Sequence, residues 1–339
     1  MDRSAGRSGK DTASWPHPLS DRPGLPHRWA DCGSAQSVLG LRPYAHTGAM
    51  TSRHAQQGLS AVRDRIGASL FERVAGPDGP AARARIHDTD GPRWFAEGSE
   101  IRRVHGDASM FVGGLRALLL QSLHPLAMAA VSAHSGYRGD PWGRLQRTST
   151  FLAVTTFGTE ADATEAVRAV RRVHERISGT APDGRPYRAS DPHLLGWVHA
   201  AEVDSFLRAH QRYGARPLDR SGCDAYVDQA ARVATELGVV DPPRSTAELA
   251  ECLAAYRPEL RGTPQARDAA RFILLRPPIP ALARIPYAVL AAGAVAMMPR
   301  WTRLPLWLPY LPLAESTAVP LAGHALVGTI RWALNSAAA

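Results

Sequence analysis

The polar residues Arg144, Arg147 and Thr148 have the types and spacing that most directly predict chemistry in this sequence. Intervals of three and four residues place them on one helix face, with Phe151 and Thr155 further along it. A guanidinium group binds oxyanions through two parallel hydrogen bonds. The pattern therefore predicts an anion site, for a phosphate or for the propionates of a haem. The alternative is an ordinary solvated helix surface.

His174 offers a nitrogen ligand from the next helical segment. It continues an apolar stripe that includes Ala163, Val167 and Val170 at helical spacing, so its imidazole is expected to face the interior. A neutral histidine is the usual protein ligand of haem iron. The alternative is a core histidine that is hydrogen-bonded to a carbonyl group.

Two further histidines belong to the candidate site. His124 precedes Pro125 inside an apolar segment, and the proline is expected to kink that helix beside the imidazole. His124 is expected to act as an acid or a base. His199 lies three residues before Glu202, so this carboxylate could orient the ring, and His199 is expected to support the cofactor. The alternative for this pair is a polar contact within one helix.

Helical periodicity and cap residues predict the elements that position these residues. Asp140 and Thr159 are candidate N-caps, and Asp191 with Pro192 opens another helix. The expected helices span residues 58–74, about 108–132 with Asp107 as its candidate N-cap, 141–157, 160–177, 192–210, 225–237, 246–256, 264–275, 280–296 and 320–334. Residues 81–94 are expected to form a loop, and no segment alternates as a strand does. The predicted fold is all-α, a single-domain multi-helix bundle around a buried haem pocket.

Composition limits the class of protein and its partners. The formal net charge is +9, but no run of five basic residues occurs, so nucleic acid is not an expected partner. The three cysteines are widely separated, which suggests a reducing compartment. No secretory signal is recognisable, so a cytoplasmic protein is expected. The apolar run 285–298 is too short to span a bilayer, although peripheral membrane contact is open to it.

The N-terminal segment has a different character from the remainder. Residues 1–49 are rich in Gly, Ser, Pro and Arg without periodicity, which predicts a disordered tail. Met50 is a plausible alternative start, so the tail could be an over-extended gene boundary. Residues 50–339 are expected to form the catalytic domain.

Several common catalytic classes lack their sequence signatures here. No Glu-x-x-His occurs, which disfavours a di-iron carboxylate bundle. The sequence also has no His-Glu-x-x-His, no G-x-G-x-x-G after a strand, no phosphate-binding P-loop and no G-x-S-x-G. Iron held by few ligands in an apolar helical pocket remains, most naturally as haem.

An ordered series of motifs resembles one known family. The motifs are LLLQSLHP at 118–125, DPWGRLQRT at 140–148, FG at 157–158, VH at 173–174 and DPHLLGWVH at 191–199. Together they resemble the MpaB and rubber oxygenase (latex-clearing protein) catalytic-domain family, over roughly residues 95–339. The resemblance implies an all-helical fold around a b-type haem, and oxidative cleavage of isoprenoid double bonds by dioxygen.

The resemblance also implies roles for individual residues. His174 matches the proximal iron ligand, while Arg144, Arg147 and Thr148 match the motif that lines the haem. The rubber-cleaving members carry Lys at the position of Arg147 and use a distal glutamate as a base. Residues 101–159 contain no Glu, and His124 is the nearest replacement by position.

These observations lead to one predicted function and one alternative. The prediction is a haem b-dependent oxygenase that acts with dioxygen on a hydrophobic, isoprenoid-like substrate. His174 would bind the iron, with Arg144, Arg147, Thr148 and His199 around the cofactor. His124, Arg147 and Thr148 would take part in catalysis. The alternative is a helical protein that binds haem or lipid without turnover.

Overall fold

The computed structural model describes residues 48–134 and 139–334. These residues form fifteen α-helices, two short 3-10 helices and one two-stranded sheet, so the predicted all-α class is confirmed. Most of the predicted tail lies outside the described residues, and Gly48 and Ala49 begin the first helix. The predicted domain boundary at residue 50 stays a prediction.

The helices follow one another along the chain with short connections. Their bounds are α1 Gly48–Ala75, α2 Gly79–Asp88, α3 Glu100–His105, α4 Met110–Gln121, α5 Pro125–His134, α6 Pro141–Phe157, α7 Glu160–Glu175, α8 Pro192–Tyr213, α9 Arg220–Leu237, α10 Thr246–Tyr256, α11 Pro264–Leu275, α12 Arg284–Ala296, α13 Arg300–Leu306, α14 Pro312–Ser316 and α15 Ala318–Leu334. The strands are β1 Ser178–Thr180 and β2 Pro186–Arg188, and the 3-10 helices are η1 Arg257–Glu259 and η2 Ala281–Ala283.

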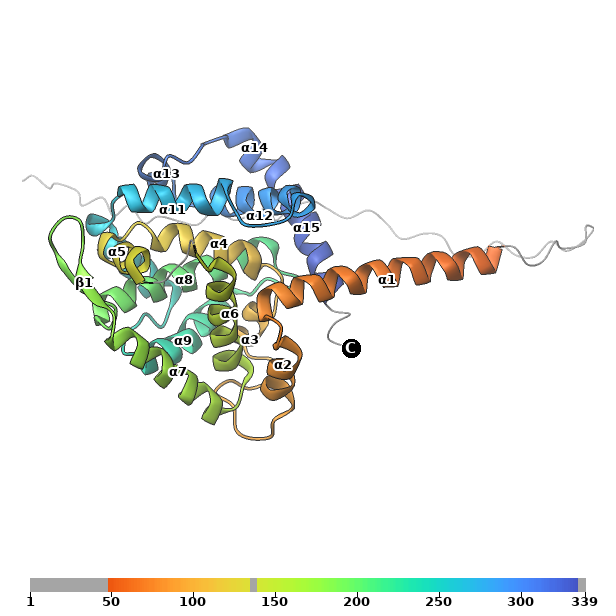
Figure 1. Cartoon of the computed structure of the whole chain (residues 1–339), viewed down its shortest axis with the longest axis horizontal. Helices are drawn as coiled ribbons and strands as arrows, with labels where there is room; N and C mark the ends of the chain where they lie inside the picture. The colour runs from red at the N-terminus through yellow and green to blue at the C-terminus, as the bar shows by residue number, and fades with distance from the viewer. Residues whose placement is uncertain (1–47, 135–138, 335–339) are drawn as a thin grey trace, which may run out of the picture. The chain divides into compact units, whose positions relative to one another are not determined.

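Helices α4 and α8 pack against each other at the centre, with α11 and α12 above them and α9 on the other side (Figure 1). A buried ion pair joins the two central helices, with 2.7 Å between Arg116 Nη2 and Asp204 Oδ2. Arg116 is fully buried and also donates to the Ser205 hydroxyl at 2.6 Å. A charge removed from water in this way needs its partner, so the pair determines how α8 sits against α4.

The helices that carry the candidate site begin where their cap residues predict. Asp140 accepts a hydrogen bond from the Gly143 amide, and Thr159 accepts one from the Asp162 amide. Asp191 likewise caps α8. These side chains satisfy amides that have no partner within their helix, which explains why the three predicted starts are correct.

The apolar segment around His124 differs from its prediction. One kinked helix from about residue 108 to residue 132 was expected, but α4 ends at Gln121 and α5 begins at Pro125, with an angle of 108° between them. Pro125 occupies the first position of α5, where its missing amide costs no hydrogen bond. The proline therefore starts a new helix, and His124 lies in the turn between the two.

Two other segments were also predicted wrongly. The expected loop at 81–94 contains most of α2, whose sequence carries little helical amphipathicity. Strands β1 and β2 pair as an antiparallel hairpin with Gly184 at positive φ in its turn. Strands of three residues are too short to show alternation.

The C-terminal helix α15 is tied to a distant part of the chain. Arg331 contacts both carboxylate oxygens of Asp107, at 2.9 and 3.0 Å, and donates to the Tyr213 carbonyl at 2.9 Å. A bidentate pair of this kind is directional as well as strong. It connects the start of α4, the end of α8 and α15.

Among the described residues, no single helix has the length and apolarity needed to cross a bilayer. Two sharply bent helix pairs, α4 with α5 and η2–α12 with α13, meet the length and composition criteria only when each pair is taken together.

Candidate functional site

The predicted anion-binding face of α6 runs from solvent into the interior. Arg147 is 65% exposed and lies 3.3 Å from Asp140, which supplies one counter-charge. Thr148 is exposed, and its hydroxyl donates to the Arg144 carbonyl at 3.0 Å. Thr155, further along the same face, is buried. The two ends of this face therefore have different surroundings, and the Arg147 and Thr148 side chains reach solvent.

His174 lies near the end of α7 and is partly buried. Its Nδ1 atom is removed from solvent and has no hydrogen-bond partner. Burial lowers the pKa of His174, so the ring is neutral at physiological pH. Buried polar atoms are almost always paired in folded proteins, which makes this nitrogen available to a ligand.

His199 has the same property on α8. Its Nε2 atom is buried without a hydrogen-bond partner, so the carboxylate of Glu202 does not hold this nitrogen. Burial lowers the pKa of His199 to about 4. Burial also raises the pKa of Glu202 to about 7, so this carboxyl group can hold or release a proton near neutral pH.

A third imidazole, which the sequence did not single out as functional, belongs to the same region. His105 Nδ1 lies 2.8 Å from the Thr156 hydroxyl on α6, and its Nε2 lies 3.3 Å from the Tyr226 hydroxyl on α9. Burial lowers the pKa of His105 to about 3. Burial, together with the charge of Glu202, raises the pKa of Tyr226. Only the tertiary fold brings these residues together, because they come from separate helices.

His174 and His199 each lie, along their own helix, between residues of the same two apolar clusters. On α7, His174 follows Val167 of one core cluster and precedes Ile177, which packs against another. On α8, His199 lies between Leu194 of the second cluster and Val203 of the first. Tyr226 contacts His105 and is influenced by the charge of Glu202, which lies one helical turn from His199. We call His105, His199, Glu202 and Tyr226 the buried imidazole centre.

His124 lies in different surroundings from the buried imidazole centre. Its ring is 1% exposed, and its Nε2 is 3.4 Å from a Glu259 oxygen. His193 Nε2 lies 2.9 and 3.0 Å from the two oxygens of the same carboxylate. We call these three residues the His–Glu cluster. The sequence motif at 191–199 contained His193, but nothing in the sequence connected it with Glu259.

Electrostatics in the His–Glu cluster are balanced between burial and charge. Burial is the largest influence on His124 and lowers its pKa, against the opposing effect of Glu259. Burial raises the pKa of Glu259, but its contacts with His193 and His124 outweigh this and hold the pKa below its usual value. The carboxylate is therefore ionised at neutral pH.

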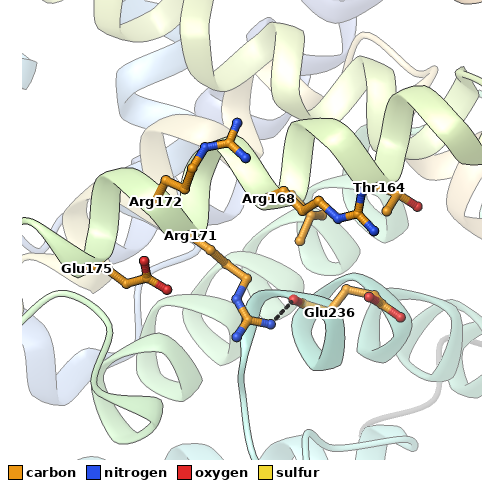
Figure 2. A pocket seen from close by; sticks show the side chains of 7 residues that line it. Thr164, Arg168, Arg171, Arg172, Glu175 and Glu236 are labelled. Atoms are coloured by element: carbon orange, nitrogen blue, oxygen red, sulfur yellow. Dashed lines mark hydrogen bonds between the residues drawn. The ribbon is translucent and has the colours of Figure 1, made fainter.

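The unpartnered imidazole nitrogens are of a type that can bind haem iron, but the described residues do not define a haem pocket. Two neutral, buried imidazole nitrogens without partners suit an iron porphyrin. A hollow between α7 and α9 is lined instead by charged side chains, including Arg168, Arg171 and Glu236 (Figure 2). Arg171 donates to the Glu236 carbonyl there at 3.2 Å. None of the predicted site residues lines this hollow, so the predicted haem pocket stays a prediction.

The structure is thus an all-helical fold whose interior contains imidazole nitrogens without hydrogen-bond partners. The family comparison gives the class directly, because residues 102–332 match the model described as "ER-bound oxygenase mpaB/B'/Rubber oxygenase, catalytic domain". The chain belongs to this family, and the predicted resemblance is confirmed.

Two curated relatives resemble part of the chain. They are "Uncharacterized protein Mb2261" of Mycobacterium bovis and "Uncharacterized protein Rv2237" of Mycobacterium tuberculosis. Each is 38% identical over 100 residues, which cover 29% of this chain and 38% of the relative. The chain thus matches well under half the length of each relative. No solved structure matches the chain.

Proposed function

We propose that this protein is a haem b-dependent oxygenase that acts with dioxygen on a hydrophobic, isoprenoid-like substrate. The observation that carries the proposal is the buried Nδ1 atom of His174, which has no partner within the protein. Family membership supports the oxygenase class. The haem and the nature of the substrate are the finer parts of the proposal.

The residues of the chain would divide the work around the cofactor. A bound haem would supply the iron at which dioxygen is activated. His174 would hold the iron, and its lowered pKa keeps a lone pair available. Arg144, Arg147 and Thr148 would bind the propionates or orient polar substrate atoms.

Proton handling falls to groups in two places. In the buried imidazole centre, the raised pKa of Glu202 lets it exchange a proton near pH 7, while His199 stays neutral and supports the cofactor. The acid–base role of His124 stays a proposal, and Glu259 is the proton acceptor next to its Nε2.

Exposed apolar side chains in one segment of the chain favour a hydrophobic substrate and membrane contact. Between residues 275 and 321, exposed apolar side chains include Leu282, Leu304 and Leu313, which are 95%, 83% and 82% exposed. Glu315 is the one acidic residue of this segment, and it pairs with Arg303 at 2.9 Å. Exposed leucines with nearby arginines and aromatic residues are typical of surfaces that contact anionic lipid. We propose that this segment contacts membranes, where hydrophobic substrates gather.

The visible spectrum of purified protein tests the haem. We expect a Soret band in wild-type protein and its loss in His174→Ala, because the iron would lose its ligand. His134→Ala is the matched control, since this histidine is exposed and bonds to Tyr187. Colourless wild-type protein with normal helical circular dichroism would overturn the haem proposal.

Oxygen consumption separates the proposed enzyme from the alternative. We expect an isoprenoid alkene to stimulate oxygen uptake by the wild-type protein and not by His174→Ala. A Soret band without uptake on any alkene in a chain-length series would favour the non-catalytic haem- or lipid-binding protein.

Vesicle sedimentation tests the membrane surface. Binding to anionic phospholipid vesicles is expected to fall about tenfold in Leu304→Glu and about tenfold in Leu313→Glu, because each change removes an apolar side chain that the bilayer would bury. Val240→Glu is the control, since Val240 is 69% exposed on another part of the chain. Equal binding by all variants contradicts the proposal.

We also propose a cytoplasmic location, which the widely separated cysteines suggest. Fractionation of the source cells tests it.

A further inference from the structure

Three side chains from distant parts of the sequence meet outside the buried imidazole centre. His124 comes from the turn between α4 and α5, His193 from the first turn of α8, and Glu259 from η1. One candidate ligand atom from each lies within 4.8 Å of the other two. We propose that this His–Glu cluster binds one divalent transition-metal ion, through His124 Nε2, His193 Nε2 and the Glu259 carboxylate.

The distances suit a compact coordination sphere. With metal–ligand bonds of about 2.0–2.2 Å, neighbouring ligand atoms in a tetrahedral site are about 3.3–3.5 Å apart. His124 Nε2 and Glu259 Oε2 already have this separation, at 3.4 Å. The 2.9 Å contact of His193 would lengthen by a few tenths of an ångström, and its approach to His124 would close by on the order of 1 Å. His193 is 54% exposed and can make that movement.

The unpartnered nitrogen of His124 is the second, independent observation. Its Nε2 is buried, and the 3.4 Å approach to Glu259 is too long for a strong hydrogen bond. An imidazole that is 99% buried and points at a carboxylate without bonding to it lacks a partner. A cation between the two groups would satisfy both.

Surrounding aromatic residues hold the two rings in place. The His193 ring lies 4.7 Å from the Tyr256 ring, and the Tyr256 hydroxyl donates to the His193 carbonyl at 2.7 Å. The His124 ring lies 6.3 Å from that of Trp197, whose indole donates to the Gln121 carbonyl at 3.1 Å. Ligands positioned in advance lose little freedom when a metal binds.

The donor set and its exposure indicate the kind of metal. Two imidazoles and one carboxylate form the set used by His₂Glu zinc sites and by mononuclear non-haem iron sites, both of which leave positions for water. Glu259 is 38% exposed, which provides an entry path and room for water ligands. Hard cations such as Mg²⁺ prefer all-oxygen sets, so they are not expected here.

One contact limits the affinity. The Ala127 amide donates to His124 Nδ1 at 3.4 Å, which favours a proton on Nε2. Metal binding would move that proton to Nδ1 and give up this long hydrogen bond, so a micromolar affinity is expected. Because one nitrogen cannot do both tasks, a bound metal would also exclude the acid–base role proposed for His124.

Cobalt provides the test, because four- or five-coordinate Co²⁺ has visible absorption bands. Tag-free full-length protein is treated with a chelator, which leaves any haem in place, and is titrated with Co²⁺ and then with Zn²⁺ as competitor. We expect one Co²⁺ per chain, its displacement by Zn²⁺, and a rise in Tm of about 5 °C at a hundredfold excess over Kd. Glu259→Gln and His193→Ala should each weaken binding by more than about 100-fold, beyond the usual cost of losing an outer hydrogen-bonding partner.

Controls keep the test independent of the haem proposal and of folding. His134→Ala should bind Co²⁺ as the wild type does, and the Soret band, where present, should be unchanged in Glu259→Gln. His124 is buried, so His124→Ala would also disturb packing. The variants are therefore made at the more exposed ligands, His193 and Glu259. Absence of a stoichiometric site in the wild type overturns the proposal, as does Co²⁺ binding that survives both ligand variants.

Discussion

Helix α8 carries histidines of two groups, and the groups differ in what faces their rings. Around His199, burial is the cause of the shifted pKa values of His199 and Glu202. Six residues earlier, His193 faces Glu259, an ionised carboxylate that reaches solvent. The first environment suits a neutral ligand for a large apolar cofactor, and the second suits a bare cation.

The difference shows that burial and a neighbouring carboxylate are separate ways in which the fold can make an imidazole suitable for binding a metal. Without a charged partner, burial keeps the ring neutral down to low pH, as the pKa of about 4 at His199 indicates. An imidazole beside a carboxylate has a negatively charged neighbour, which would attract a metal ion to the pair. The predictions below begin with the element that both groups share and then separate them.

The largest expected effect is on the ion pair that anchors α8. Asp204→Asn would leave the fully buried Arg116 without its counter-charge, and we expect the free energy of unfolding to fall by about 3–5 kcal/mol. Urea denaturation measures this. Glu165→Gln, which breaks the exposed pair with Arg172, should leave the midpoint unchanged. Equal midpoints for both variants would show that the central pair does not anchor the fold.

The next effect distinguishes the buried imidazole centre by its carboxyl group. The folded-state pKa of Glu202, about 7, lies above its ordinary 4.5, so folding favours the protonated form. The wild type therefore loses stability as the pH rises from 4.5 to 7. Glu202→Gln removes this loss, and the variant should gain about 3 kcal/mol relative to wild type between pH 4.5 and 8. Parallel pH profiles from urea unfolding would contradict a buried, unpaired Glu202.

His199 gives a pH dependence of opposite sign. Its pKa of about 4 lies below the ordinary 6.5, so between these pH values the unfolded chain binds a proton at His199 and the folded chain does not. Its contribution to stability is complete above pH 6.5 and falls as the pH drops toward 4. Between pH 7 and pH 5, the free energy of unfolding of His199→Gln should therefore fall by about 2 kcal/mol less than that of the wild type. Thermal melts at both pH values measure it, with the exposed His134→Gln as a control that keeps the wild-type slope.

The smallest expected effect is at the His–Glu cluster without metal. Glu259 is 38% exposed, so Glu259→Gln should cost about 0.5 kcal/mol or less at pH 7. Because the folded-state pKa is lowered, this contribution is present above pH 4.5 and is lost as the pH falls through the folded-state value. A cost of several kcal/mol, measured by urea unfolding in chelator, would mean that the cluster is a structural network complete without a cation.

The elements that carry the candidate site could be predicted because their signals are local. Asp140, Thr159 and Asp191 cap helices within three residues, and the apolar stripe before His174 is contained in one helix. The break at Pro125 was located correctly, but its angle was not, because only packing against other helices determines whether a proline bends a helix or starts one.

Groupings between helices could not be obtained in the same way. Glu259 lies 66 residues from His193, and Tyr226 lies 121 residues from His105. No spacing rule connects such positions, since their proximity depends on how several helices pack. For Arg147 and Thr148 the sequence left both an anion site and a solvated surface open, because only tertiary packing determines where along its length this helix face becomes buried.

The bond between Asp107 and Arg331 spans 224 residues and has a consequence for biosynthesis. On the ribosome, the carboxylate at the start of α4 is made long before the guanidinium that pairs with it. Chains that emerge N-terminus first cannot complete this contact until α15 has left the exit tunnel. During that interval the ends of α4 and α8 lack the contacts that α15 makes with them, so this part of the core is completed only after the residues from Asp107 to Arg331 have all been made.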